Sequence, residues 1–188
     1  MSSILKVDTI QDSSGNNIIN ESGNTITIGA SGDTTNIVGT LQNDGAAIDN
    51  TPIFVAYHDG DRTVDNGSLT KVIAGTEIID TDSAYDTSTG RFTVPSGKAG
   101  YYKITAMMTH RNTSNDQTGC GFAFYKNGSS HPFAFSTSQF TSHRNDTRSY
   151  SYIFNLSAGD YIEFYAYTEG TLSGAKIERP TVMGFKLI

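Results

Sequence analysis

The sequence predicts an all-β protein, a ten-stranded sandwich or jelly roll preceded by an extended β-rich stalk. The 188-residue chain contains 19 glycines, ten phenylalanines and ten tyrosines, a composition typical of short strands joined by tight turns. Apolar residues alternate with a period of two, and no stretch shows a convincing helical period of about 3.6 residues. All the aromatic residues follow residue 52, so we expect two domains, 1–52 and 53–188.

The first domain repeats a short pattern, in which Ser-Gly and then Asn or Asp precede a few alternating apolar residues. The copies begin at Ser14, Ser22 and Ser31. One chain cannot bury enough apolar surface here to offset its ordering entropy, so the segment is either a disordered tail or an oligomeric stalk. The regular turns favour a stalk, formed by several identical chains around one axis. Its predicted core consists of Ile18, Ile19, Ile26, Ile28, Ile37 and Val38.

The second domain contains ten runs with the composition of strands. Gly90 permits the turn that leads into the fourth run, and Pro95 ends that run without needing a ladder hydrogen bond. Residues 156–160 form a tight turn between two long runs. The predicted strands are 53–58, 69–73, 76–80, 91–95, 100–110, 119–126, 132–137, 147–155, 160–168 and 181–188. Ten strands are an ordinary number for a sandwich or jelly roll.

Tyrosines occupy the positions of two predicted strands that would normally face water. Tyrosine buries a large apolar area and keeps a hydroxyl for water or a partner, so a row of tyrosines suggests a contact surface. The alternative is a set of ordinary surface tyrosines. The predicted interface between copies of the chain consists of Tyr150, Tyr152, Tyr161, Tyr165 and Tyr167.

Charge and composition argue against several classes of partner. The net charge is −6 and the basic residues do not cluster, so nucleic acid is not an expected partner. Cys120 is the single cysteine, which excludes an intrachain disulfide and predicts a small buried core residue. The N-terminus lacks the apolar core of a signal peptide, and no run of about 18 apolar residues predicts membrane insertion.

The sequence gives little support for catalysis. It lacks the Gly-x-Ser-x-Gly elbow, His-Glu-x-x-His and a phosphate-binding loop, so we expect no enzyme and no cofactor. Asp59, Asp61 and Asp65 lie close together and could bind Ca²⁺. Their segment lacks the glycine at the sixth position of a calcium loop and its final glutamate, so a polar loop without metal is favoured.

Long loops at one end of the second domain are the expected recognition site. Because antiparallel strands alternate in direction, loops 111–118, 138–146 and 169–180 share the end that points away from the stalk. The tripeptide His-Arg-Asn occurs twice there. Their planar donors and acceptors suit sugar hydroxyls or carboxylates, although ordinary solvated loops are the alternative. The candidate ligand-binding residues are Arg111, Asn112, Asn115, Asp116, His143, Arg144 and Asp146.

Residues 53–188 resemble the trimeric jelly roll of the complement first-component q-chain globular head and tumour necrosis factor. The resemblance rests on Phe54-x-Ala56, on "YDTSTGRFTVPSGKAGYYKI", on "KNG" at 126–128, on "LSAGDYIEF" at 156–164 and on "GFKLI" at 184–188. It implies a jelly-roll head that forms a homotrimer through flat aromatic faces. The missing collagen-like stalk and signal peptide argue against a secreted complement-like protein.

The N-terminal stretch "SSILKVDTIQDSSGNNIINESGNTITIG" resembles the leaders of tail-fibre and other virion proteins of marine tailed bacteriophages. This resemblance implies that the segment attaches to another virion protein or trimerises. The two resemblances together predict a virion protein assembled in the host cytoplasm, a trimeric tail fibre or receptor-binding tip that recognises a host-surface glycan. The alternatives are a capsid decoration, head-fibre or neck protein and, more distantly, a soluble lectin-like module.

Overall fold

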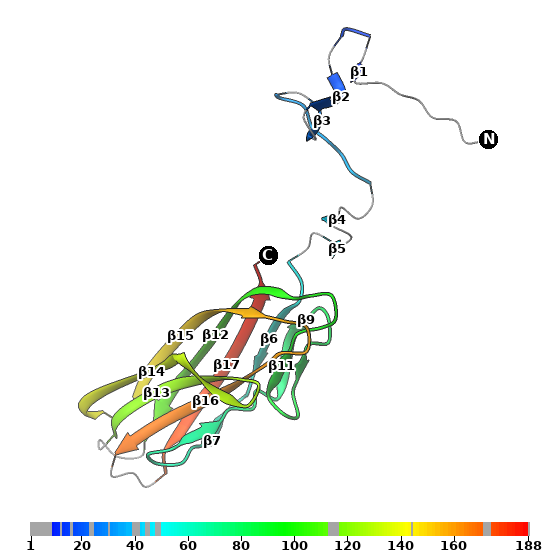
Figure 1. Ribbon diagram of the computed structural model, residues 1–188. Coiled ribbons are helices and arrows are strands. Elements are labelled where there is room, and N and C mark those ends of the chain that lie inside the picture. The colour runs from blue at the N-terminus through cyan, green and yellow to red at the C-terminus, as the bar shows by residue number, and fades with distance from the viewer. Residues whose placement is uncertain are drawn as a thin grey trace. The chain divides into compact units, whose positions relative to one another are not determined.

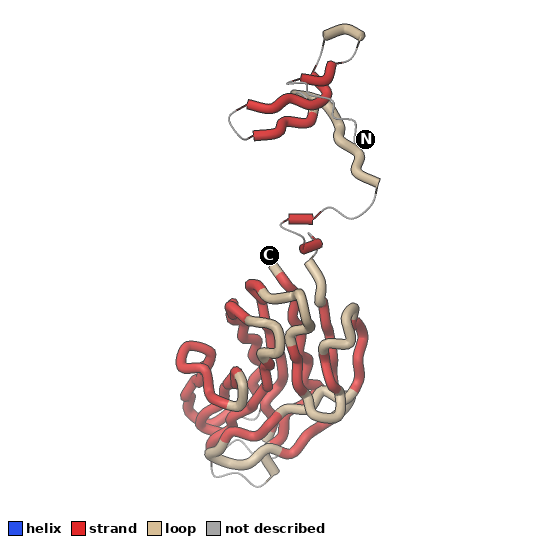
Figure 2. The backbone as a smooth tube through the Cα atoms, turned by 45° about the vertical axis from the view of Figure 1, so that its right-hand side comes forward, coloured by secondary structure: helices blue, strands red, loops and turns tan. Residues whose placement is uncertain are grey.

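The chain is described by a computed structural model over residues 9–11, 13–15, 17–22, 25–29, 31–38, 42–43, 46–47, 50–112, 117–143, 145–170 and 174–187. Every regular element in these ranges is a β-strand, as Figure 2 shows. Contacts within the chain divide it into two units, Met1–Ile48 and Asp49–Ile188. The described residues contain no helix that is long and apolar enough to cross a membrane.

The first unit contains two small antiparallel sheets. Strands β1 (Thr9–Gln11), β2 (Asn17–Ser22) and β3 (Thr25–Ile28) form one, and β4 (Gln42–Asn43) pairs with β5 (Ala46–Ala47). The six residues of the predicted stalk core are 37–93% exposed in the single chain. Their burial between several chains stays a prediction.

The second unit is a sandwich of two antiparallel sheets (Figure 1). Sheet I has the order β15-β12-β17-β6-β9, and β7 pairs with β17 at one end. Its strands are β6 (Ile53–Tyr57), β7 (Asp61–Thr63), β9 (Thr76–Asp80), β12 (Gly100–Arg111), β15 (Asn145–Leu156) and β17 (Lys176–Lys186).

Sheet II has the order β10-β11-β16-β13-β14, and β8 pairs with β16. Its strands are β8 (Leu69–Lys71), β10 (Tyr85–Asp86), β11 (Arg91–Thr93), β13 (Gln117–Lys126), β14 (Ser129–His143) and β16 (Tyr161–Gly170). We call the end where β6 begins and β17 finishes the proximal end. The opposite end, where β12 finishes and β13 begins, is the distal end.

Aromatic side chains fill the space between the sheets. The ring of Phe54 stacks on Phe92, with centroids 4.6 Å apart, and on Tyr85 at 5.3 Å. The rings of Phe164 on β16 and Phe124 on β13 meet edge to face, with centroids 5.6 Å apart. This contact links two neighbouring strands of sheet II. Burial of such large rings is the main favourable contribution to folding, and aromatic pairs add specific geometry to it. The predicted all-β jelly-roll class is confirmed.

The ten predicted strands are all present; β9 has the predicted bounds, 76–80, and the bounds of the others differ from the predicted ones. The short strands β7 and β10 were not predicted, β14 continues to His143, and β17 begins at Lys176. Residues 138–146 and 169–180 are therefore mostly strand, and the prediction of long distal loops there is wrong. Polar residues of β14 and β17 join the sheets because ladder hydrogen bonds come from the backbone, whatever the side chain.

Candidate functional site

Arg111, one of the predicted ligand-binding residues, lies at the distal end of β12. Its Nη1 atom is 3.9 Å from Oδ2 of Asp61 and 3.8 Å from Oε2 of Glu178. Lys176 places Nζ 3.2 Å from the same Asp61 oxygen. All four side chains remain partly exposed, so these ion pairs contribute little to stability. The cluster forms a charged distal surface with both signs present.

The structure separates Arg111 from most of the other predicted ligand-binding residues. Asn112 is only 1% exposed, so its prediction as a surface donor is wrong. Asn115, Asp116 and Arg144 lie outside the described residues. His143 ends β14, and its side chain also lies outside the description. A shared distal binding site therefore rests on Arg111 alone among these residues.

Asp146 was expected on an open loop, but it lies on the inward face of β15. Its Oδ2 atom accepts hydrogen bonds from Nε of Arg148 at 2.5 Å and from the Cys120 thiol at 3.1 Å. Desolvation opposes the charge, yet these two hydrogen bonds outweigh it and lower the pKa of Asp146. Burial, with the nearby Asp146, raises the pKa of Cys120 to about 12, so the thiol is unreactive at neutral pH. The prediction of Cys120 as a buried core residue is confirmed.

The buried side chains of His110 and Thr168 form a polar contact between the two sheets. Nδ1 of His110 is 3.0 Å from the hydroxyl of Thr168, and both residues are fully buried. Desolvation lowers the pKa of His110 to about 4, so its ring is neutral at pH 7. Among the residues that the structure describes, Nε2 of His110 and both polar atoms of the Gln117 amide have no hydrogen-bond partner. Such groups are costly in a dry interior, which makes this part of the core sensitive to change.

A metal centre is not found in the described part of the chain, where no group of three His, Cys, Asp or Glu residues is placed to hold an ion. Asp61 instead lies on β7 and pairs with Lys176.

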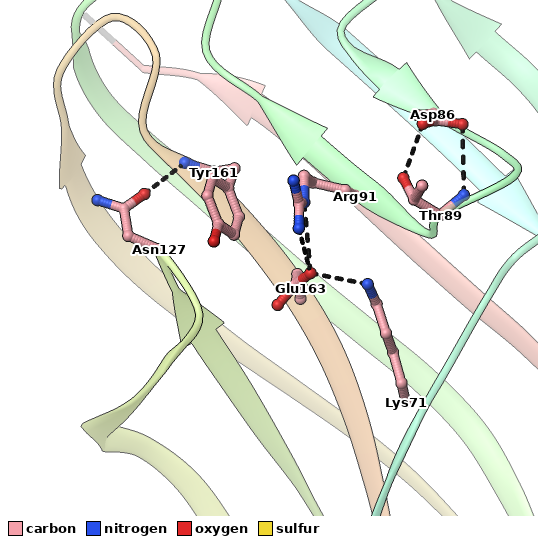
Figure 3. A network of polar contacts seen from close by, with 7 residues as sticks. All are labelled: Lys71, Asp86, Thr89, Arg91, Asn127, Tyr161 and Glu163. Atoms are coloured by element: carbon pink, nitrogen blue, oxygen red, sulfur yellow. Dashed lines mark hydrogen bonds and ion pairs between the residues drawn. The ribbon is translucent and has the colours of Figure 1, made fainter.

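The outer face of sheet II carries a charged network, shown in Figure 3. Glu163 is only 5% exposed, and its Oε1 accepts from Nζ of Lys71 at 2.7 Å and from Nη2 of Arg91 at 2.9 Å. The Arg91 guanidinium also lies 3.8 Å from the centroid of the Tyr161 ring. Burial opposes the charge of Glu163, but the two cations lower its pKa overall. The network ties β8 and β11 to β16.

Tyr161, Tyr165 and Tyr167 lie half-buried on this same outer face, since the alternate residues of β16 fill the core. The Tyr165 ring stacks on Tyr125 with centroids 4.1 Å apart. Arg91 covers a face of Tyr161. Two of these rings are therefore already engaged by neighbours of the same chain, which suits a structural role on sheet II.

Tyr150 and Tyr152 do not share that surface. They lie on the inward face of β15 and pack against the core, with the Tyr150 ring 5.7 Å from that of Phe124. The five tyrosines therefore lie on two different surfaces of the chain, and their part in an interface between copies stays a prediction. Ile153 faces outward in their place, because a strand turns alternate side chains to opposite faces.

The outer face of sheet I carries a row of exposed apolar side chains, which we call the apolar patch. Its members are Ile79, Tyr101, Met107, Ile153 and Phe185, and they are 39–55% exposed. The register places Lys103 between Ile153 and Phe185, so a polar residue separates these two apolar members of the patch, and it places Val55 opposite Ile79. Sequence analysis missed this patch. Its signal in the sequence was Ile153, which alternates with Tyr152 and Phe154 along one predicted strand.

Two solved structures illustrate the architecture that this chain shares with known proteins. The globular domain of zebrafish complement 1qA protein is 13% identical and superposes with a TM-score of 0.55, covering 73% of this chain and 97% of that one. The PRD1 vertex protein P5 is 15% identical, with a TM-score of 0.53, covering 72% of this chain and 96% of that one. A comparison with protein-family profiles gives no match, and a comparison with curated protein sequences gives none. These likenesses show the fold of the second unit, a jelly roll.

Proposed function

We propose that this chain is a non-enzymatic structural protein of a bacteriophage particle, a homotrimeric tail fibre or receptor-binding tip. Its N-terminal unit attaches to another virion protein, and its jelly-roll head recognises a host-surface glycan. The likeness of the head to the PRD1 vertex protein P5 supports a place in a viral particle. The observation that carries the proposal is the apolar patch, because it gives the head a surface suited to self-association.

The patch fits a second copy of the chain better than it fits water. Tyrosine, methionine and phenylalanine are enriched where proteins meet, and the patch has one of each among its five residues. Lys103, Thr105 and Ser151 interrupt it with polar groups, which keeps the single chain soluble enough to assemble. We propose this surface as the interface in place of the five tyrosines expected from the sequence.

The exposed isoleucines of the first unit support the same assembly. Ile26 and Ile28 alternate along β3 and face water in the single chain, as a shared core around one axis requires before assembly. Three copies around one axis would cover these isoleucines, as a shared core requires. The number three follows the resemblance of the head to trimeric jelly rolls.

The decisive experiment locates the protein and tests its binding together. Gold-labelled antibody against the head, viewed on intact particles by electron microscopy, should mark the tail tip. Purified full-length protein should bind the host bacterium, and periodate oxidation of the cell-surface sugars should abolish that binding. Absence of label from particles would contradict the whole proposal.

A capsid decoration, head-fibre or neck protein is the second candidate. The likeness to a vertex protein favours it, since that neighbour is named for a position on the particle other than a tail tip. Label on the capsid or neck, without binding of the purified protein to cells, would support this second function.

A further inference from the structure

A pocket of about 240 Å³ opens on the outer face of sheet I near the distal end. Three neighbouring strands build its wall: Thr147 comes from β15, Met107 to Thr109 from β12, and Glu178 and Arg179 from β17. Of the three loops predicted from the sequence, only 169–180 contributes to this wall, through Glu178 and Arg179, which the structure places on β17.

A β-bulge in β17 shapes the pocket. Met107 pairs with Thr181 and Thr109 pairs with Glu178, so Arg179 and Pro180 both stand opposite one residue of β12. Arg179 has φ +45°, a left-handed conformation that is uncommon for residues other than glycine. Its amide donates to the carbonyl of Gly60 at 3.0 Å, which holds the bulge in place. Bulges often re-aim a side chain, and here the bulge brings Arg179 into the wall.

The wall offers hydrogen-bond donors, acceptors and an apolar surface. The Arg179 guanidinium only donates, the Glu178 carboxylate only accepts, and the hydroxyls of Thr109 and Thr147, 2.8 Å apart, do both. No ion pair joins Arg179 to another described residue, whereas Glu178 faces Arg111 at 3.8 Å. Met107, 42% exposed, supplies the apolar contact.

We propose that this pocket binds one ring of a neutral saccharide, and this assignment rests on the glycan recognition of the proposed function. A sugar ring presents hydroxyls that both donate and accept, beside apolar C–H faces, and the wall matches both. One cation and one anion leave the wall without net charge, so an acidic sugar would gain Arg179 but be opposed by Glu178. The volume lies below the roughly 300–1,000 Å³ of sites for drug-sized ligands, which suits a single ring.

The pocket adjoins the apolar patch at Met107, so we expect a second copy to cover the other four patch residues and to leave Met107 open to the sugar. A second copy seated on the patch would lie beside the bound sugar. The test therefore uses the full-length protein in its assembled form.

Methionine methyl groups report on the pocket directly. The chain contains four methionines, Met1, Met107, Met108 and Met183. Met107 and Met108 belong to the wall, whereas Met183 lies on the same sheet outside it. Protein labelled with ¹³C at these methyl groups is titrated with the methyl glycosides of glucose, galactose, mannose and N-acetylglucosamine. We expect at least one sugar to shift the Met107 resonance saturably, with Kd near the millimolar range, while Met183 stays unchanged.

Two substitutions and a matched control assign the binding to the wall. Arg179→Asn removes the guanidinium and keeps a residue that tolerates the left-handed conformation, and Thr109→Val removes one hydroxyl. Each should weaken the titration at least tenfold. Thr105→Val breaks the equivalent hydroxyl pair with Ser151, 2.7 Å apart on the same two strands but outside the wall, and should leave binding unchanged.

Each outcome separates the pocket from the proposed function. If the protein binds host cells but none of the four sugars moves Met107, the pocket assignment is wrong and the proposed function stands. If sugars bind the pocket but cells do not bind the protein, the pocket stands and the proposed function fails. Tighter binding of methyl glucuronide than of methyl glucoside would overturn the neutral-sugar assignment.

Discussion

Nδ1 of His110 on β12 and the hydroxyl of Thr168 on β16 lie 3.0 Å apart, so one buried hydrogen bond joins the two sheets at the distal end. The imidazole is neutral there because desolvation lowers its pKa from 6.5 to about 4. Protonation of this buried ring should therefore destabilise the head at acidic pH. Asp146 and Arg148 are the charged groups that act on the ring, with opposite effects.

Stability should fall as the pH drops from about 6.5 towards 4. In this window the unfolded chain binds a proton at His110 and the folded chain does not, so protonation favours the unfolded state. A shift from 6.5 to about 4 corresponds to a loss on the order of 3 kcal/mol, complete below the folded pKa. Thermal unfolding of the wild type and of His110→Gln, measured from pH 7.5 to 4, tests this. The variant should show a flatter pH dependence in that window, and parallel curves would contradict the assignment.

Gly184→Ala should destabilise the head by about 1–3 kcal/mol, the usual range for overpacking a core. A methyl group there would lie 2.5 Å from Cε1 of Phe54 and 2.6 Å from Cδ1 of Ile104, both buried. Gly75→Ala is the matched control, since its added methyl group meets nothing within 4 Å. Chemical denaturation should leave the control within about 1 kcal/mol of the wild type. Equal effects of the two substitutions would argue against close packing around Phe54.

Glu163→Gln should destabilise the fold by about 1–2 kcal/mol, because it removes the anion shared by Lys71 and Arg91. Hydrogen bonds to charged groups contribute more than neutral ones, but both cations are partly exposed and solvent recovers part of the loss. Glu77→Gln, an exposed carboxylate on β9 in no ion pair with a described residue, serves as the control. Urea unfolding at pH 7 measures both. The destabilisation by Glu163→Gln should also become smaller at high salt. If Glu163→Gln is as stable as the wild type, the network is only a surface contact.

Ile153→Lys combined with Phe185→Lys should abolish self-association of the head, since it places two charges in the apolar patch. Light scattering of the wild type should give three times the chain mass of 20.2 kDa. Tyr167→Lys, on the outer face of sheet II, is the control and should keep the wild-type mass. A monomeric wild type would rule out the proposed trimer, and dissociation by the control alone would move the interface to sheet II.

Sequence patterning captured the strands whose side chains show a contrast between faces. The run 160–168 alternates Ile162, Phe164 and Ala166 with tyrosines and Glu163, and β16 follows it closely. The last part of β14 was not predicted, because residues 138–143 are polar except for Phe140. Only its backbone pairing with β13 identifies it as strand. The same reason accounts for the beginning of β17, where a bulge accommodates a proline.

The candidate sites were harder to predict, since they depend on which strands become neighbours. The sequence placed Arg111 at the distal end correctly, but it could not tell that Asn112 is buried or that Asp146 pairs with Arg148 and Cys120. The pocket joins β15, β12 and β17, and its residues are separated in the chain by up to 72 positions, between Met107 and Arg179. A local sequence pattern cannot reveal that strands so far apart in the chain become neighbours.

The sequence by itself determined the all-β class, the division of composition near residue 52 and most strands of the head, because period-two alternation and turn residues act locally. The tertiary structure alone decided the faces. It turned Tyr150 inward and Ile153 outward, and it gathered the apolar patch from separate strands. The physical reason is that alternation says two residues face opposite sides, whereas only the packing of one sheet on the other decides which side is the core.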